Sequence, residues 1–160
     1  SNFMYLKLMC LQGYFIKEIL NLANTLALKL TYNKKPMFLC KEFEKTKLHV
    51  IYLHFPEPAV PKDGSSAGTP ITISIYILLN EKIIKKNVAI TGEINLQGKV
   101  SAIGGLNLKI LGGIKAGVKS FIFPEDNKKD YNKFIEKYQD KNTIPDDVTF
   151  TSVKNIKDVF

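Results

Sequence analysis

Apolar residues recur early in the chain at the spacing of a single helix face. From Tyr14 to about Thr31 they follow one another three or four positions apart, and this predicts a long helix with one buried side. A second helix is predicted from Ser66 to Leu79, although its many isoleucines would also suit a strand. Further helices are expected from Leu106 to Ala116 and from Asn127 to about Gln139, and another begins at Ile156.

Short stretches rich in β-branched and aromatic residues predict strands between these helices. They cover residues 48–55, 88–94, 99–103, 120–123 and 148–153. The segments 56–64 and 140–145 carry prolines and polar residues and are expected to be loops. The alternation predicts one domain with a sheet covered by helices. The two adjoining short strands and the long first helix argue against a purely doubly wound fold.

The net charge of +8 comes from lysine alone, since none of the 23 basic residues is an arginine. Arginine is the usual reader of guanine edges. We therefore expect a solvated lysine surface and no sequence-specific nucleic-acid site, with weak salt-sensitive binding as the alternative. The longest apolar run, residues 71–79, is far shorter than the roughly 18 residues of a membrane helix, so no membrane partner is expected. Cys10 and Cys40 lack metal-ligand spacing, which favours free thiols in a reducing compartment.

A glycine-bearing polar loop places a serine at the start of the predicted helix at 66–79. The loop reads Pro61-Lys-Asp-Gly-Ser-Ser-Ala-Gly68. Free backbone N–H groups at a helix start stabilise negative charge, which suits a nucleophile. The alternative is an ordinary serine cap.

A nucleophilic serine needs a base, and the two histidines are weak candidates. His49 and His54 lie on one predicted strand at an odd offset, so they face opposite sides of the sheet. A Ser-His-Asp triad through His54 stays open, but nothing else in the sequence supports it. A desolvated lysine is the known substitute. With 23 lysines in the chain, this chemistry alone does not choose one.

Three ordered motifs resemble those of the Lon family's proteolytic domain. The first, Asp63-Gly-Ser-Ser-Ala-Gly68, is similar to the family's Pro-Lys-Asp-Gly-Pro-Ser-Ala-Gly. The second, residues 89–100, is similar to its Ala-Met-Thr-Gly-Glu stretch. The third, Ile103-Gly-Gly-Leu-Asn-Leu-Lys109, is similar to its Gly-Gly-Leu-Lys-Glu-Lys. The resemblance runs from about Leu11 to the chain end. It implies that Ser66 is the nucleophile and Lys109 its base.

The resemblance also implies supporting residues and a fold. Thr91 is expected to hydrogen-bond Lys109 and orient it. Asp63 is expected to pair with Lys109 at rest or to cap the helix at Ser66, and His54 to lie near the site or serve in packing. The implied fold is an α+β domain with a mixed sheet, like the second domain of a small-subunit ribosomal protein.

The implied function is that of a serine endopeptidase, the proteolytic part of an ATP-dependent Lon protease that degrades unfolded or damaged proteins. The full-length protein is expected to be a hexamer in the mitochondrial matrix, with the cytoplasm as the alternative, because residues 127–130 resemble mitochondrial-type members. Two alternatives to this function are a non-catalytic Lon-like oligomerisation module and a basic nucleic-acid-binding domain. Retention of both Ser66 and Lys109 favours the enzyme.

The chain lacks the Gly-x-x-x-x-Gly-Lys-Ser/Thr phosphate loop. We therefore expect no cofactor or metal in this domain, with ATP and Mg²⁺ bound by an ATPase module outside it. Residues 1–10 are expected to be a cloning remnant and a truncated lead-in, and residues 11–160 the proteolytic domain. The strands that the family places before its first long helix are expected to be missing.

Some positions depart from the family's motifs. Ser65 stands where the motif has proline, Asn107 and Leu108 replace Lys-Glu, and Tyr52 stands where a histidine is common. Pro70 lies in the first turns of the predicted helix and is expected to distort the end that presents Ser66.

Overall fold

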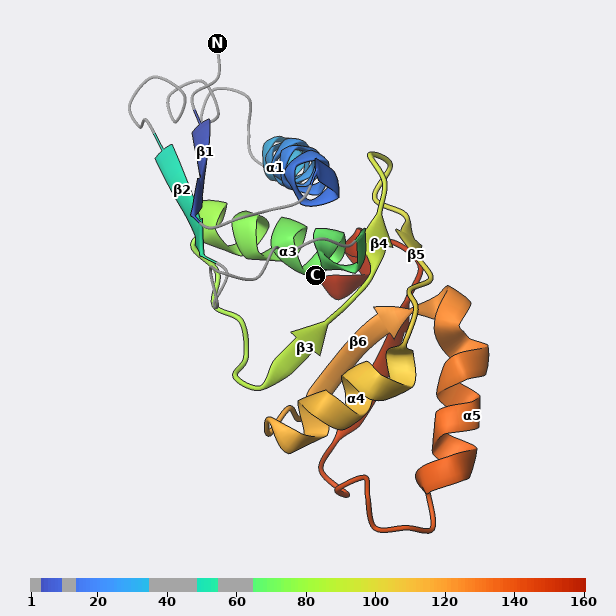
Figure 1. The fold of residues 1–160 in the computed structure, drawn as a ribbon. Coiled ribbons are helices and arrows are strands. Elements are labelled where there is room, and N and C mark those ends of the chain that lie inside the picture. The colour runs from blue at the N-terminus through green and yellow to red at the C-terminus, as the bar shows by residue number, and fades with distance from the viewer. Residues whose placement is uncertain (1–3, 10–13, 35–48, 55–64) are drawn as a thin grey trace. The chain divides into compact units, whose positions relative to one another are not determined.

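The computed structural model describes the backbone of residues 4–9, 14–34, 49–54 and 65–160, and the side chains of 18–31 and 66–160 (Figure 1). The predicted loop at 56–64 and both cysteines lie outside these residues. The chain divides into two compact units. The first unit comprises residues 1–65 and 71–82, and the second comprises residues 66–70 and 83–160.

The first unit contains two strands and most of two helices. Strand β1 (Met4–Met9) pairs in parallel with β2 (His49–His54). Helix α1 (Tyr14–Lys34) is longer than predicted, and β1 was not predicted at all. Helix α3 (Gly68–Leu79) runs from the second unit into the first. It is a helix despite its isoleucines because it buries side chains on most of its circumference, at Ile71, Thr72, Ile73, Ile75, Tyr76 and Leu79.

The second unit is built on a parallel sheet with the strand order β3-β6-β7. These strands are β3 (Val88–Ile90), β6 (Ser120–Pro124) and β7 (Thr149–Val153). Helix α4 (Leu106–Lys115) precedes β6, and α5 (Lys128–Tyr138) connects β6 to β7. A small antiparallel pair, β4 (Glu93–Ile94) and β5 (Val100–Ser101), follows β3. Three short 3₁₀ segments complete the described elements: η1 (Ser65–Ala67), η2 (Glu125–Asn127) and η3 (Ile156–Val159). The predicted α+β class is confirmed.

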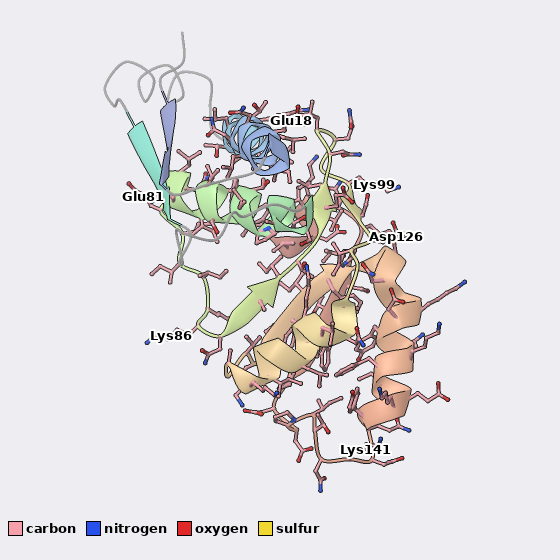
Figure 2. All side chains as sticks on the ribbon, in the orientation of Figure 1. Glu18, Glu81, Lys86, Lys99, Asp126 and Lys141 are labelled. Carbon is pink, nitrogen blue, oxygen red and sulfur yellow. The ribbon has the colours of Figure 1, made fainter. Side chains whose placement is uncertain are left out.

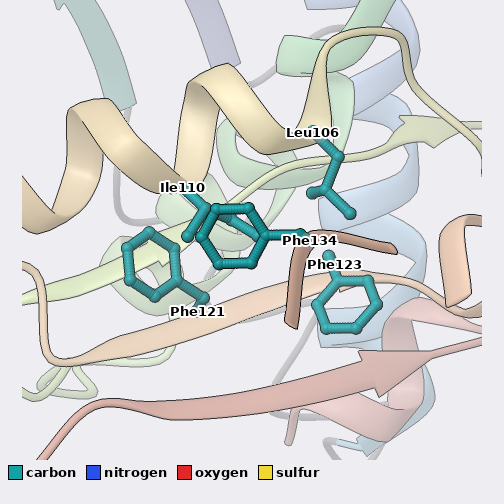
Figure 3. Packing of buried hydrophobic residues seen from close by; sticks show 5 residues of the cluster. All are labelled: Leu106, Ile110, Phe121, Phe123 and Phe134. Carbon is teal, nitrogen blue, oxygen red and sulfur yellow. The ribbon is translucent and has the colours of Figure 1, made fainter. Parts of the chain in front are cut away.

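The core of the second unit fixes α4 against the sheet. Leu106 and Ile110 of α4 pack with Phe121 and Phe123 of β6 and with Phe134 of α5 (Figure 3). Because Phe121 and Phe123 are two residues apart on one strand, both helices lie on the same face of the sheet. Each fully buried apolar side chain contributes about 1.5–3 kcal/mol. Helix α4 is therefore held on the sheet by its first residue, Leu106, and by Ile110 one turn later.

Two predicted elements differ in detail. The strand expected at 88–94 is two strands, because the backbone turns away from β6 at Gly92. The helix expected from Ile156 is the 3₁₀ segment η3, which begins with a capping box between Asn155 and Asp158. The other predicted helices and strands are confirmed to within a few residues at each end.

Exposed lysines are spread over separate elements of the second unit. Lys86 precedes β3, Lys99 lies between β4 and β5, and Lys141 follows α5 (Figure 2). This spread fits a solvated lysine surface. Across the described ranges, no helix combines the length and the apolar character of a membrane span.

Candidate active site

Ser66 lies in η1, the single 3₁₀ turn before α3. In a continuous helix its carbonyl would accept the N–H of the residue four positions later, which here is Pro70 and has none. The Ser66 carbonyl instead accepts the N–H of Gly92 at 3.1 Å, and Thr69 N–H donates to the Gly92 carbonyl at 3.1 Å. Pro70 therefore leaves the Ser66 carbonyl available for Gly92, and the two backbone bonds join residues 66–69, here called the serine segment, to Gly92. Helix α3 continues from Gly68 to Leu79.

The two backbone bonds of Gly92 to Ser66 and Thr69 explain why the predicted strand breaks after Thr91. Its N–H still donates to the Ile122 carbonyl at 3.1 Å, so Thr91 stays attached to β6. One residue later Gly92 turns its backbone to the serine segment. A side chain at Gly92 would meet its neighbours, since a Cβ there would lie 2.5 Å from Val100 Cγ1 and 2.9 Å from Thr69 Oγ1. Close approach of the two backbones thus requires glycine.

Lys109 reaches this junction from the first turn of α4. Its backbone N–H donates to the Gly105 carbonyl at 3.1 Å. Its Nζ donates to Ser66 Oγ at 2.7 Å and to Thr91 Oγ1 at 3.2 Å. Three segments far apart in sequence therefore meet at one amine. The structure brings together the first three residues that the family resemblance singled out.

The surroundings of Lys109 favour its neutral form. Loss of solvent lowers the pKa of Lys109 below its ordinary 10.5. The amine adjoins a pocket of about 290 Å³, and of the described residues that line it Lys109 alone is charged. The other lining residues are Ser66, Ala67, Pro70, Ala89, Ile90, Thr91, Leu106, Ile110, Phe121, Ile122 and Phe123. No carboxylate among them stabilises the ammonium ion.

Two predicted supporting residues are not placed at this site. Asp63 lies outside the described residues. His54 ends strand β2 of the first unit, where the structure describes its backbone only. In the described part of the chain no three His, Cys, Asp or Glu residues gather as metal ligands.

Sequence reasoning missed the residues that hold Ser66 next to Thr91 and Lys109. Pro70 was read as a distortion, whereas its missing N–H leaves the Ser66 carbonyl for Gly92. Gly92 was read only as part of a motif. A proline two residues after a helix start, and a glycine next to a strand threonine, were the available signals.

We expect Gly92→Ala to lower strongly the kcat of the reaction that Ser66 and Lys109 carry out. The new Cβ has no room beside Val100 and Thr69, so residues 91–92 must shift, and a displacement of about 1 Å can cost about 100-fold in rate. Overpacking should also cost about 1–3 kcal/mol of stability. Steady-state kinetics and thermal unfolding measure the two effects.

Gly112→Ala is the matched control for this substitution. A Cβ at Gly112, on an exposed position of α4, has no atom within 4 Å, so the helix should gain about 0.5–1 kcal/mol and kcat should stay unchanged. An alanine at 92 with the original kcat would show that the close approach of these backbones does not matter for the site.

A hydroxyl and a desolvated amine 2.7 Å apart, beside an apolar pocket of an α+β domain, are the groups that a hydrolase of the serine–lysine class requires. Comparison with known proteins agrees with this class. The model of the Lon protease (S16) C-terminal proteolytic domain matches residues 9–160. The chain belongs to this family.

Curated relatives come from bacteria and from mitochondria. The chain is 39% identical over 148 residues to "Lon protease 2" of Borreliella burgdorferi, covering 92% of this chain and 17% of that protein. It is 35% identical over 159 residues to "Lon protease homolog, mitochondrial" of Drosophila melanogaster, covering 91% of this chain and 15% of that protein. It is 52% identical over 93 residues to the Lon protease of Clostridium acetobutylicum, covering 58% of this chain and 12% of that protein. The chain thus spans less than a fifth of the length of these relatives.

Proposed function

We propose that this chain is the peptidase part of an ATP-dependent Lon protease and cleaves internal peptide bonds with Ser66 and Lys109. The observation that carries the proposal is the 2.7 Å contact between Lys109 Nζ and Ser66 Oγ. It occurs beside an apolar pocket that contains no other charge among the described lining residues. An amine there loses its proton more easily than a free lysine does.

The proposed reaction begins with neutral Lys109. Its Nζ lone pair accepts the Ser66 hydroxyl proton as Oγ attacks the substrate carbonyl. Backbone N–H groups around Ser66, at the start of α3, donate to the oxyanion. Lys109 then gives the proton to the leaving amine, and a water molecule hydrolyses the acyl-enzyme with Lys109 again as base. In the neutral amine Thr91 Oγ1 accepts one Nζ hydrogen, and this orients the amine so that its lone pair can face Ser66.

The apolar pocket supports protein and peptide substrates with an apolar side chain next to the cleaved bond. Burying such a side chain there contributes binding energy and excludes water from the amine. A charged side chain would be desolvated without a partner other than Lys109. Unfolded or damaged proteins expose such apolar residues, which fits a role in protein quality control.

The wider setting of the domain is part of the same proposal. ATP and Mg²⁺ act in an ATPase module beyond this chain, and the full-length protein assembles as a homo-hexamer. Family membership supports both parts of this proposal. We place the protein in the mitochondrial matrix, which the mitochondrial relatives support. Bacterial relatives match as well, so the cytoplasm is the alternative.

Labelling with a serine-directed phosphonate tests the nucleophile. The reagent should modify Ser66, identified by peptide mass mapping, and Lys109→Ala should slow the labelling because the base is gone. Ser65 is a built-in control, as it is a second hydroxyl one residue away. Modification of Ser65 would contradict the assignment, and the absence of any labelled serine would favour a non-catalytic oligomerisation module.

A further inference from the structure

The segment that leads into α4 has little to hold it by itself. It contains Gly104 and Gly105 in succession, and Gly105 adopts the left-handed conformation with φ of 67°. The helix start has no side-chain cap. Glycine loses more conformational freedom on folding than any other residue, so another contact must fix where α4 begins.

That contact comes from Asn127 at the end of η2. Its Oδ1 accepts the Ile103 backbone N–H at 2.9 Å, and its Nδ2 donates to the Ile103 carbonyl at 2.8 Å. One side chain thus binds both backbone groups of the residue that precedes the two glycines. The Asn127 side chain is 1% exposed, and hydrogen bonds in such a site are stronger than in water.

The orientation of this amide is itself set. Asp130, one turn into α5, accepts a hydrogen bond from Asn127 Nδ2 at 2.9 Å. The nitrogen therefore faces Asp130 and the Ile103 carbonyl, and the oxygen faces the Ile103 N–H. The segment η2, which Asn127 ends, directly follows β6, whose Phe123 lies in the core. The amide is anchored to the same sheet that Thr91 N–H joins through Ile122.

We propose that Asn127 is a positioning residue for Lys109, which it sets by clamping Ile103 and so fixing the start of α4 relative to the sheet that carries Thr91. The proposal rests on the function proposed above. The core side chains Leu106 and Ile110 hold α4 down on the sheet. The two hydrogen bonds from Asn127 to Ile103 limit sliding and rotation of the first turn of α4, where Lys109 must keep its 2.7 Å contact with Ser66.

Asn127→Ala should lower kcat about 100-fold with little change in KM, because a small displacement of the base is enough for such a loss. A loosened first turn also moves Lys109 away from Ser66 and from the apolar lining of the pocket. Partial burial lowers the pKa of Lys109, so the pH–rate profile should shift to higher pH where that burial is lost. Steady-state kinetics as a function of pH, with thermal unfolding of each variant, measure both effects on the whole chain.

Asn127→Asp keeps the volume of the side chain but removes its hydrogen-bond donor, so it tests the hydrogen bonds alone. It can still accept the Ile103 N–H but donates to neither the Ile103 carbonyl nor Asp130, and two carboxylates then adjoin. Adding Asp130→Asn exchanges the two groups and restores a donor between them. The double variant should recover part of the lost kcat. Asn127→Asp also keeps the test decisive if the alanine variant does not fold.

Asn155→Ala is the matched control. Asn155 bonds Lys157 N–H and the Gln97 carbonyl through its side chain, away from α4, so its loss should lower stability without moving the pH–rate profile. An Asn127 variant with unchanged kcat and profile would overturn the inference, as would an equal shift in Asn155→Ala. Failure of the proposed function looks different, since hydrolysis would then persist in Ser66→Ala.

Discussion

Replacing Ser66 or Lys109 by alanine should each lower kcat for peptide hydrolysis on the order of 10⁴-fold or more, because nucleophile and base act as one unit. Among the described residues that line the pocket, no second amine could replace Lys109, and the only hydroxyl besides that of Ser66 is Thr91 Oγ1, which lies farther from Nζ, at 3.2 Å against 2.7 Å. The double variant should be no worse than either single one. Thermal unfolding should change little, since a hydrogen bond of a surface-accessible pair contributes only about 0.5–1.5 kcal/mol.

Peptide cleavage followed by mass spectrometry, with unfolding curves for each variant, tests this result. Lys115→Ala is a matched control, because Lys115 is an exposed lysine in the last turn of the same helix. Ser65→Ala controls for the neighbouring hydroxyl. Full activity of Ser66→Ala in a folded protein would remove Ser66 as the nucleophile.

The elements with strong local patterns were predictable. The core helices α1 and α4 follow the helical spacing of apolar residues, and β6 is a compact run of β-branched and aromatic residues ended by Pro124. Strand β1 was missed because its partner β2 is more than 40 residues away in sequence, and strand pairing over such a distance leaves no local signal.

The meeting of Ser66 with Lys109 was predicted from the resemblance, not from local chemistry. Any of 23 lysines could have served. The contacts that hold the site were not predictable in either way. Gly92 joins the serine segment through backbone groups, and Asn127 reaches Ile103 across 24 residues. Backbone hydrogen bonds and long-range amide contacts depend on tertiary packing, which residue types alone do not encode locally.

Pro70 illustrates how a local rule can describe only part of an outcome, since the end that presents Ser66 is a 3₁₀ turn and not α-helix. Proline inside a helix removes a donor and normally weakens the helix. Near the helix start the missing donor is one that the first turn leaves unpaired anyway. The carbonyl it would have bonded belongs to Ser66 and accepts Gly92 N–H instead. The residue that seemed to threaten the site thus supports the contact that positions it.

Peptide hydrolysis should rise from neutral to alkaline pH, and Lys109→Arg should be inactive at every pH in this range. Lys109 acts as a base only after losing its proton, and desolvation lowers its folded pKa below 10.5. The neutral fraction at a given pH therefore exceeds that of a free lysine and grows as pH increases toward the folded pKa. An arginine keeps the positive charge but has a pKa above about 12 and accepts no proton.

Among the described residues, the groups that face the Lys109 amine are the hydroxyls of Ser66 and Thr91 and the apolar lining of the pocket. None of these titrates between about pH 7 and pH 9, so the rise in kcat over that interval reports on the lysine itself. Lys115→Arg, on the exposed side of α4, should keep the original profile and separates the loss of a base from the loss of a lysine. A flat profile together with an active Lys109→Arg variant would mean that the proton of Ser66 goes elsewhere, and the amine at 2.7 Å would then serve only to hold the hydroxyl in place.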